Sequence, residues 1–307
     1  MIPFVKMHGC GNDFILVRER DLVRNPDAAA DAGPDRDDWI VPPGELARRV
    51  CDRHFGLGAD GLLVYGPRPS RDGMSRLRMF YWNADGSRAA MCGNGARCIV
   101  RLACERGEAR APLVLETDAG PRPADVRLED GRVAAVEIDM GLPAWSPEDV
   151  PVRGGVGLVE APVQVAGEPH AVTALSMGNP HAIVFVGDPA ALAATPLESV
   201  GRSLSEHALF PQGANASFAT VTGAELHVRT WERGSGATLA CGTATCAAFA
   251  AAQRTGRLVT SKATVHLPGG LVEVERTADG HLWLRGPAEY VAEGTLASGL
   301  LVAESGG

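Results

Sequence analysis

Two short segments of the chain each place a cysteine directly before a run of small residues that predicts a helix. Residues 91–97 read Met-Cys-Gly-Asn-Gly-Ala-Arg, and residues 240–245 read Ala-Cys-Gly-Thr-Ala-Thr. The helices predicted over 93–105 and 242–254 are hydrophobic on most sides, and such a helix must be covered on several sides by other elements. The chain is therefore expected to fold as two domains, each a sheet curled around one of these helices.

The same motifs recur in the same order in the two halves of the chain. A Gly-Asn turn precedes an apolar stretch at residues 11–17 and again at 178–184, and a polar cluster follows at 83–87 and again at 232–236. The spacing to the cysteine is also equal, since 92 − 83 and 241 − 232 are both 9. This repetition predicts a duplicated domain, with the boundary near residues 140–143.

The remaining pattern is a mixture of hairpins and short helices. Hairpins are predicted for 126–138 around Asp130-Gly131 and for 265–274, and a turn at 279–280 precedes another strand. Further helices are predicted at 44–53 and 197–207, and residues 21–44 are predicted to be a solvated loop. The expected fold class is α/β (α+β), with mostly antiparallel sheets.

Composition excludes several functions. The chain has 307 residues, which is enough for two domains, and its net charge of −8 with 5% aromatic residues argues against nucleic-acid binding. No apolar stretch is long enough to span a membrane, and the N-terminus does not resemble a signal peptide. Seven cysteines, an odd number, fit a reducing cytoplasm better than a disulfide framework.

The two Cys-Gly turns suggest acid–base chemistry. The N-terminus of a helix lowers the pKa of a thiol from about 8.5, so both Cys92 and Cys241 are expected to ionise near neutral pH. Two thiols in equivalent settings are what a cofactor-free racemase needs, because one removes a proton from a carbon and the other delivers a proton to its opposite face. The backbone N–H groups that follow would bind the substrate carboxylate; they belong to Gly93, Asn94, Gly242 and Thr243.

The other cysteines are expected to have structural roles. Cys98, Cys104 and Cys246 are interpreted as small buried hydrophobic residues. At about 100° per residue, Cys92, Cys98 and Cys104 point in three separate directions, so one helix cannot bring them to one metal ion.

Seven ordered motifs, spread over essentially the whole chain, together resemble the diaminopimelate epimerase family. They are residues 8–14 (HGCGNDF), 52–61 (DRHFGLGADG), 83–87 (NADGS), 91–98 (MCGNGARC), 178–181 (GNPH), 231–236 (WERGSG) and 240–243 (ACGT). Seven motifs in one order are far more specific than any one of them.

This resemblance implies two pseudo-symmetric domains, 1–140 with 286–307 and 141–285, with the active site in the cleft between them. It implies a homodimer that interconverts LL- and meso-2,6-diaminopimelate without a cofactor or a metal, on the route to lysine and peptidoglycan. Cys92 and Cys241 match the two catalytic bases, and Glu232 and His181 match neighbouring catalytic positions. The matched substrate-binding positions are Asn12, Asn83, Gly93, Asn94, Asn179, Asn215, Glu232, Arg233, Gly242 and Thr243.

These identities suit a substrate whose far end is a second zwitterion. A guanidinium can bind the carboxylate at that far end, a carboxylate can bind the ammonium, and amides can bind either group. Arg233 supplies the guanidinium, Glu232 the carboxylate, and the asparagines the amides. The chain departs from the family at Ala237, where Glu is common, at Ala244, where Gly is common, and in the strand after Asn215. These changes could alter substrate preference.

Three alternatives remain open at the level of sequence. The nearest is a cofactor-independent racemase of another amino acid, of proline or histidine type. A thiol redox sensor would use Cys92 and Cys241 as an exchanging pair, although the chain has no Cys-x-x-Cys motif. The third is an amino-acid-binding protein without catalysis.

Overall fold

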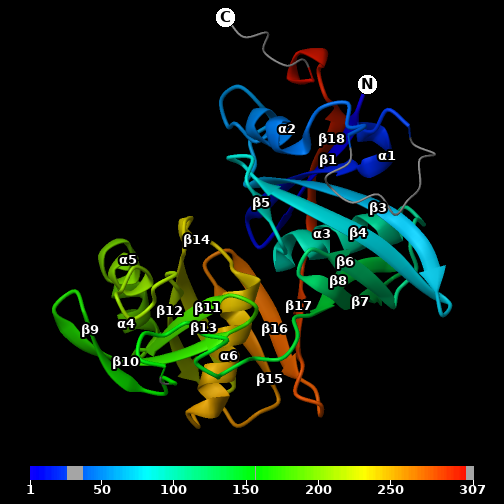
Figure 1. Cartoon of the computed structure of the whole chain (residues 1–307). Helices are drawn as coiled ribbons and strands as arrows, with labels where there is room; N and C mark the ends of the chain where they lie inside the picture. The colour runs from blue at the N-terminus through cyan, green and yellow to red at the C-terminus, as the bar shows by residue number, and fades with distance from the viewer. Residues whose placement is uncertain (26–36, 156, 302–307) are drawn as a thin grey trace, which may run out of the picture. The chain divides into compact units, whose positions relative to one another are not determined.

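One strand arrangement occurs twice in the described residues, 1–25, 37–155 and 157–301, of this computed structural model. The chain divides into unit 1, which comprises Met1–Ile138 and Pro287–Gly307, and unit 2, which comprises Asp139–Gly286. Figure 1 shows helices on the faces of the sheet in each unit.

The sheet of unit 1 has the strand order β18-β1-β2-β3-β4-β6-β7-β8. The β2–β3 and β4–β6 pairs are parallel and the other neighbours are antiparallel, with β5 added beside β4. Its elements are β1 (Pro3–Gly9), β2 (Asn12–Arg18), α1 (Glu19–Leu22), α2 (Pro43–Val50), β3 (Gly61–Arg71), β4 (Met74–Asn83), β5 (Arg88–Ala89), α3 (Gly93–Glu105), β6 (Leu113–Thr117), β7 (Gly120–Glu129), β8 (Arg132–Asp139), β18 (Glu289–Thr295) and the short 3-10 helix η2 (Ser298–Leu300).

The sheet of unit 2 has the order β9-β10-β11-β12-β13-β15-β16-β17. Here the β11–β12 and β13–β15 pairs are parallel, the other neighbours are antiparallel, and β14 lies beside β13. Its elements are β9 (Ala161–Val165), β10 (Glu168–Ser176), β11 (Pro180–Phe185), α4 (Pro189–Ala194), the π-helix η1 (Leu197–Gly201), α5 (Arg202–Ser205), β12 (Asn215–Thr222), β13 (Glu225–Glu232), β14 (Gly236–Thr238), α6 (Gly242–Arg254), β15 (Lys262–Leu267), β16 (Gly270–Arg276) and β17 (Leu282–Gly286).

The two strand orders match position by position. β1 corresponds to β10, β4 to β13 and β7 to β16, and the cysteine helices α3 and α6 follow equivalent strands. The first position of unit 1 is filled by β18, from the end of the chain, where unit 2 has β9. The repeat seen in the sequence is therefore a repeat of topology.

The helices α3 and α6 lie inside the curl of their sheets, as predicted. Buried residues cover most of both helices, and α6 contacts strands on several sides, including β10–β13, β16 and β17. Figure 1 shows α6, in gold, across the strands of unit 2. The predicted fold class is confirmed, since each unit is a mostly antiparallel sheet around a central helix.

The prediction of a solvated loop over residues 21–44 is wrong at both of its ends. Val23 and Trp39 form an isolated β-bridge, and both are buried together with Val41 in the core between the sheet and α2. Burial of their apolar side chains offsets the entropic cost of ordering the backbone on either side. The middle of the predicted loop, residues 26–36, lies outside the described residues.

The helix predicted over 197–207 differs in kind from the observed one. Residues Leu197–Gly201 form a π-helix, and only Arg202–Ser205 are α-helical. Gly201 packs so closely on β13 that a Cβ there would come 2.9 Å from the Cβ of Trp231. This tertiary contact is not visible in the local apolar pattern that predicted an α-helix.

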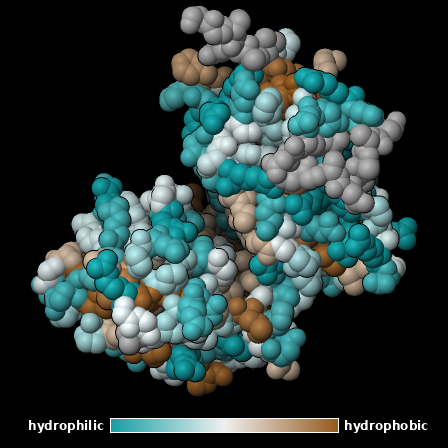
Figure 2. All heavy atoms as spheres, viewed as in Figure 1, coloured by the Kyte–Doolittle hydropathy of each residue, from teal (hydrophilic) through white to brown (hydrophobic). Residues whose placement is uncertain are grey.

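The face of the chain seen in Figure 2 is mostly polar. On the face seen in Figure 2, brown hydrophobic residues form small separate groups among teal and white ones. Among the residues that the structure describes, none of the helices has the length and apolar character that a membrane crossing needs.

Candidate active site

The Cys92 thiol lies at the start of α3 and is half-buried. Cys92 is the N-cap residue, with extended backbone (φ −141°, ψ 118°), and its side chain does not cap the helix. The first backbone N–H groups of a helix have no acceptor within the helix, and together with the helix dipole they favour an anion. The predicted carboxylate cradle at Gly93 and Asn94 therefore lies at a helix start, where an anion is favoured.

Asn12 is the first residue of β2, and its amide oxygen points toward the Cys92 thiol. Asn12 Oδ1 lies 3.7 Å from Cys92 Sγ and accepts a hydrogen bond of 3.1 Å from Asn94 Nδ2. Its other end is fixed, because Asn12 Nδ2 donates to Asp60 Oδ2 at 2.6 Å. Asp60 was not among the predicted site residues, although it lies within one of the seven motifs.

The Arg97 side chain forms hydrogen bonds with the first turn of α3. Its side chain is completely buried, and it donates to Asn94 Oδ1 at 2.9 Å, to the Pro287 carbonyl at 3.1 Å and to the Gly93 carbonyl at 3.5 Å. The Asn94 amide is thus oriented at both ends, by Arg97 and by Asn12. Arg97 was not among the predicted site residues, although its i+3 spacing from Asn94 on a helix was a usable signal.

The Cys241 thiol occupies the equivalent position at the start of α6 but has a different partner. It is the N-cap residue (φ −131°, ψ 112°) and is 8% exposed. Its Sγ–H donates to Glu232 Oε2 at 3.1 Å, and Thr243 Oγ1 lies 3.5 Å away. The second oxygen, Glu232 Oε1, accepts 2.6 Å from Thr238 Oγ1, a residue that sequence analysis also missed.

The expected low pKa of both thiols is wrong for Cys241. Burial, followed by the negative charge of Glu232, raises the pKa of Cys241 well above its ordinary value. Hydrogen bonds from Thr243 and from the Ala244 backbone lower the pKa, but by less. The helix N-terminus is therefore outweighed, and burial together with the Glu232 carboxylate favours the thiol form of Cys241.

Glu232 and Asn83 occupy equivalent places, which explains the equal spacing in the sequence. Asn83 ends β4 opposite Gly61, and Glu232 ends β13. The Asn83 side chain donates to Ser87 Oγ at 3.0 Å, within its own turn. At this equivalent strand position, unit 1 therefore has an amide side chain and unit 2 has a carboxylate.

His181 and Asn215 lie beside Glu232 at the same end of the sheet of unit 2. His181 pairs with Asn215 across β11 and β12, and Asn215 Oδ1 accepts from the Arg233 backbone N–H at 2.9 Å. The His181 ring is fully buried, with Nε2 2.8 Å from Asn179 Oδ1. Asn179, His181 and Asn215, all predicted, are therefore brought together.

The His181 ring is neutral at neutral pH. Burial, followed by the charge of Arg233, lowers the pKa of His181 to about 3. If Asn179 presents its oxygen, the ring proton is on Nε2, and the buried Nδ1 is a lone-pair acceptor that has no partner among the described residues.

Arg233 has an exposed side chain, and its guanidinium donates to the Gln212 carbonyl at 2.7 Å. Gly213, with φ +69°, leaves room for the Arg233 side chain. A Cβ at residue 213 would lie 3.0 Å from Arg233 Cδ, which is a tight contact. Gly242, the first residue of α6, is buried, and Thr243 is half-buried.

The other cysteines lie away from helix starts. Cys98 and Cys246 are buried as predicted, whereas Cys104 is half-buried. Burial raises the pKa of Cys98 to about 12 and that of Cys104 to about 11, so neither is a reactive thiolate near neutral pH.

Comparison with solved structures defines the class of fold. The chain matches a probable proline racemase from Agrobacterium radiobacter with a TM-score of 0.66 and 19% identity, over 97% of this chain and 93% of that one. A hydroxyproline epimerase from Agrobacterium vitis matches with a TM-score of 0.64 and 16% identity, over 96% and 90%. At this identity the likeness establishes the fold alone, which this chain shares with both proteins.

Sequence comparison gives the family. The profile of the diaminopimelate epimerase family matches residues 4–146 and 173–291. The diaminopimelate epimerase of Moorella thermoacetica is 43% identical over 95% of this chain and 98% of its own length, and that of Synechococcus elongatus is 42% identical over 96% and 98%. The chain belongs to the diaminopimelate epimerase family, which confirms the resemblance seen in its motifs.

Proposed function

We propose that this chain epimerises LL-2,6-diaminopimelate to the meso form without a cofactor, with Cys92 and Cys241 as the two acid–base groups. The observation that carries the proposal is that the two thiols are N-cap residues of equivalent helices in two units of the same topology. The proposal requires the two units to bring both thiols to opposite faces of one α-carbon.

The step is a proton exchange that balances. One cysteine, as thiolate, takes the α-proton, and the other, as thiol, gives its proton to the opposite face of the same carbon. The carbanion is stabilised by hydrogen bonds to the adjacent carboxylate, for which we assign the helix starts at Gly93-Asn94 and Gly242-Thr243. The loss of one such donor typically costs about 2.7–4 kcal/mol.

The two thiols have different hydrogen-bond partners. Cys241 donates to a carboxylate and starts as the acid, whereas Cys92 faces the neutral oxygen of Asn12. When Cys241 has to act as the base, Glu232 Oε2 is in position to take its proton. Because both oxygens of Glu232 already accept hydrogen bonds, this role suits it better than binding the distal ammonium.

The remaining predicted residues are assigned to the substrate. Arg233 is charged and exposed, which suits the distal carboxylate of the substrate, and Asn12, Asn83, Asn179 and Asn215 supply amide contacts. His181 is assigned to the catalytic site as a neutral hydrogen-bonding group rather than a charged one.

The substrate assignment is tested by turnover of purified protein. LL-diaminopimelate is supplied without added cofactor beside a panel that includes proline, hydroxyproline and other monoamino acids. We expect formation of meso-diaminopimelate at least about 10²-fold faster than racemisation of any member of the panel, because a site built for charged groups leaves them unpaired with a shorter substrate. Turnover of a monoamino acid alone would instead favour the second candidate, which the racemase fold supports.

The role of Glu232 predicts a change in the pH profile. Glu232→Gln removes a charge that raises the pKa of Cys241, so that pKa should fall. The limb of the rate profile that reports Cys241 should therefore move to lower pH, and kcat should fall by about 10²-fold because the proton acceptor is lost. Thr238→Val is the matched control, since it removes a hydrogen bond to Glu232 and keeps the charge. An unmoved limb would contradict the assignment.

We also propose that the protein is a cytoplasmic homodimer. The odd number of cysteines favours a reducing compartment, and β18 supports self-association because it is an exposed strand that carries Tyr290 and Val291. Light scattering on the purified protein should give twice the chain mass, and a monomer at micromolar concentration would contradict the dimer.

A further inference from the structure

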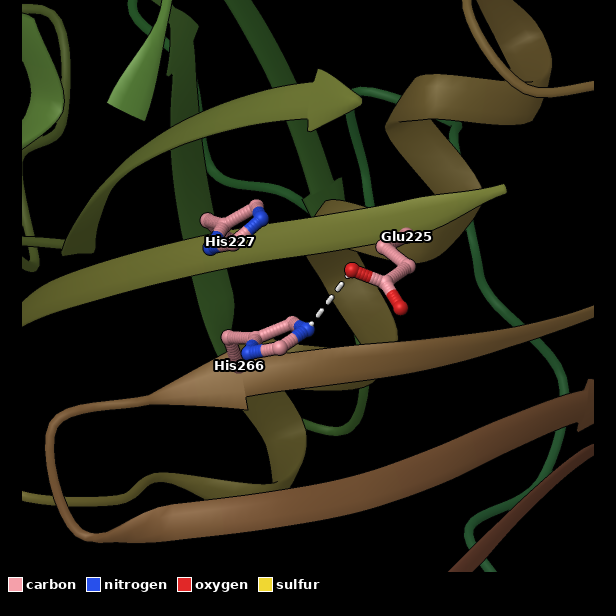
Figure 3. A group of neighbouring side chains, drawn as sticks. All are labelled: Glu225, His227 and His266. Atoms are coloured by element: carbon pink, nitrogen blue, oxygen red, sulfur yellow. Dashed lines mark hydrogen bonds and ion pairs between the residues drawn. The ribbon is translucent and has the colours of Figure 1, made fainter. Parts of the chain in front are cut away.

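Three potential metal ligands meet on the sheet of unit 2. Glu225 and His227 lie two residues apart on β13, and His266 lies directly opposite His227 on the parallel neighbouring strand β15. Side chains two residues apart on a strand share a face, as do residues paired across strands. Figure 3 shows both imidazoles and the carboxylate projecting from adjacent strands toward one another.

The distances within this group are close to those of a coordination shell. Its three ligand atoms, one from each residue, lie within 4.8 Å of one another, and His266 Nε2 is 3.0 Å from Glu225 Oε2. Two ligands at about 2.0–2.1 Å from a tetrahedral Zn²⁺ are themselves roughly 3.4 Å apart. The carboxylate and the His266 ring are therefore already near ligand spacing.

We propose that Glu225, His227 and His266 bind one divalent transition-metal ion, with water completing the shell. Two imidazoles and one carboxylate suit Zn²⁺, Co²⁺, Ni²⁺ or Cu²⁺, whereas Mg²⁺ and Ca²⁺ prefer shells made of oxygen alone. The ion would replace the contact between the two rings, which stack with centroids 4.2 Å apart and an interplanar angle of 14°. Binding turns the rings about Cβ–Cγ so that their lone pairs converge, and both histidines are half-buried rather than locked in the core.

The electrostatics of the group suit a cation. Glu225 contributes a negative charge and is exposed, so it is hydrated and able to reorient.

The position of the site indicates a structural role. The β13–β15 ladder contains only three paired positions, and His227–His266 is the last of them. A metal ion there would tie the two strands together. Glu225 and Glu232 are seven residues apart on one strand, which is roughly 23 Å, so this site is separate from the proposed catalytic centre.

The test uses Co²⁺ and Zn²⁺ with the full-length protein and the variants His227→Gln and His266→Gln. His170→Gln, on β10 of the same unit, is the matched control. We expect the wild type and the control to bind one Co²⁺ with the visible absorption of a tetrahedral nitrogen–oxygen site. Loss of a ligand should weaken binding at least as much as loss of a second-shell partner, which is about 10–100-fold.

A second readout separates this site from the thiols. Zn²⁺ should raise the melting temperature of the wild type and the control more than that of either variant, since only the intact site binds the folded state. All variants should keep their epimerase activity in metal-free buffer, which shows that they fold. The proposal would be overturned by equal Co²⁺ affinity in all four proteins, or by a cobalt spectrum dominated by thiolate charge transfer.

Discussion

Replacing either Cys92 or Cys241 with serine should lower the rate of epimerisation by about 10²–10⁴-fold in both directions. Serine keeps the size of the side chain, but its hydroxyl ionises far less readily than a thiol, so proton transfer on one face of the α-carbon is lost. Initial rates with LL- and with meso-diaminopimelate measure the effect.

Cys104→Ser is the matched control for the two thiol variants. Cys104 is a half-buried cysteine near the end of α3 and has no place in the proposed chemistry. We expect its rate to stay within about threefold of the wild type, because half-buried positions outside the site tolerate a change of this size. Wild-type turnover in either Cys92→Ser or Cys241→Ser would contradict the two-thiol assignment.

Arg97→Met should lower the free energy of unfolding by about 3 kcal/mol. The arginine is fully buried, and methionine fills part of its volume but removes the side-chain hydrogen bonds to Asn94 Oδ1 and to the Gly93 and Pro287 carbonyls. Each buried acceptor that loses its partner costs about 1–3 kcal/mol, and partial relaxation keeps the total near the lower end. Chemical denaturation measures the change.

Arg127→Met is the control for Arg97, since the ion pair of Arg127 within the described part of the chain is with Glu129 on the surface, at 3.4 Å. Such an exposed pair contributes less than about 1 kcal/mol. Arg97→Met should also raise KM, because the Asn94 amide loses the hydrogen bond from Arg97 that orients it. A loss of stability equal to that of Arg127→Met would show that the buried contacts of Arg97 contribute little.

Local signals in the sequence were sufficient for the elements that carry the thiols. The helices predicted over 93–105 and 242–254 are observed as Gly93–Glu105 and Gly242–Arg254, and the predicted hairpin around Asp130-Gly131 is formed by β7 and β8. Small residues, Cys-Gly starts and Asp-Gly turns act over a few residues, so one segment is enough to predict them.

Contacts between strands could not be predicted in the same way. The hydrogen bond from Cys241 to Glu232, the bond from Asn12 to Asp60 and the meeting of His227 with His266 all depend on sheet register. Period-2 patterning says which face a residue occupies but not which strand lies beside it. The pKa of Cys241 was mispredicted for the same reason, since the helix start is local and the carboxylate that opposes it comes from β13.

The repeated topology therefore does not make the two halves chemically equal. Glu232 occupies the place that Asn83 has in the other unit, so Cys241 contacts a carboxylate whereas Cys92 contacts the amide oxygen of Asn12, even though their backbones match. In the proposed mechanism one thiol is protonated and the other deprotonated at a time, and Glu232 Oε2 is the proton acceptor that we assign to Cys241.

The fate of the α-hydrogen in heavy water tests the two-thiol mechanism most directly. LL-diaminopimelate is incubated with the wild-type protein in D₂O, and the isotope at the α-carbon is measured in product and in recovered substrate at low conversion. The mechanism predicts that the meso product carries deuterium at the inverted carbon while the remaining LL substrate still carries hydrogen. Product that retains the original hydrogen would mean that one base serves both faces, and would contradict the assignment of Cys92 and Cys241.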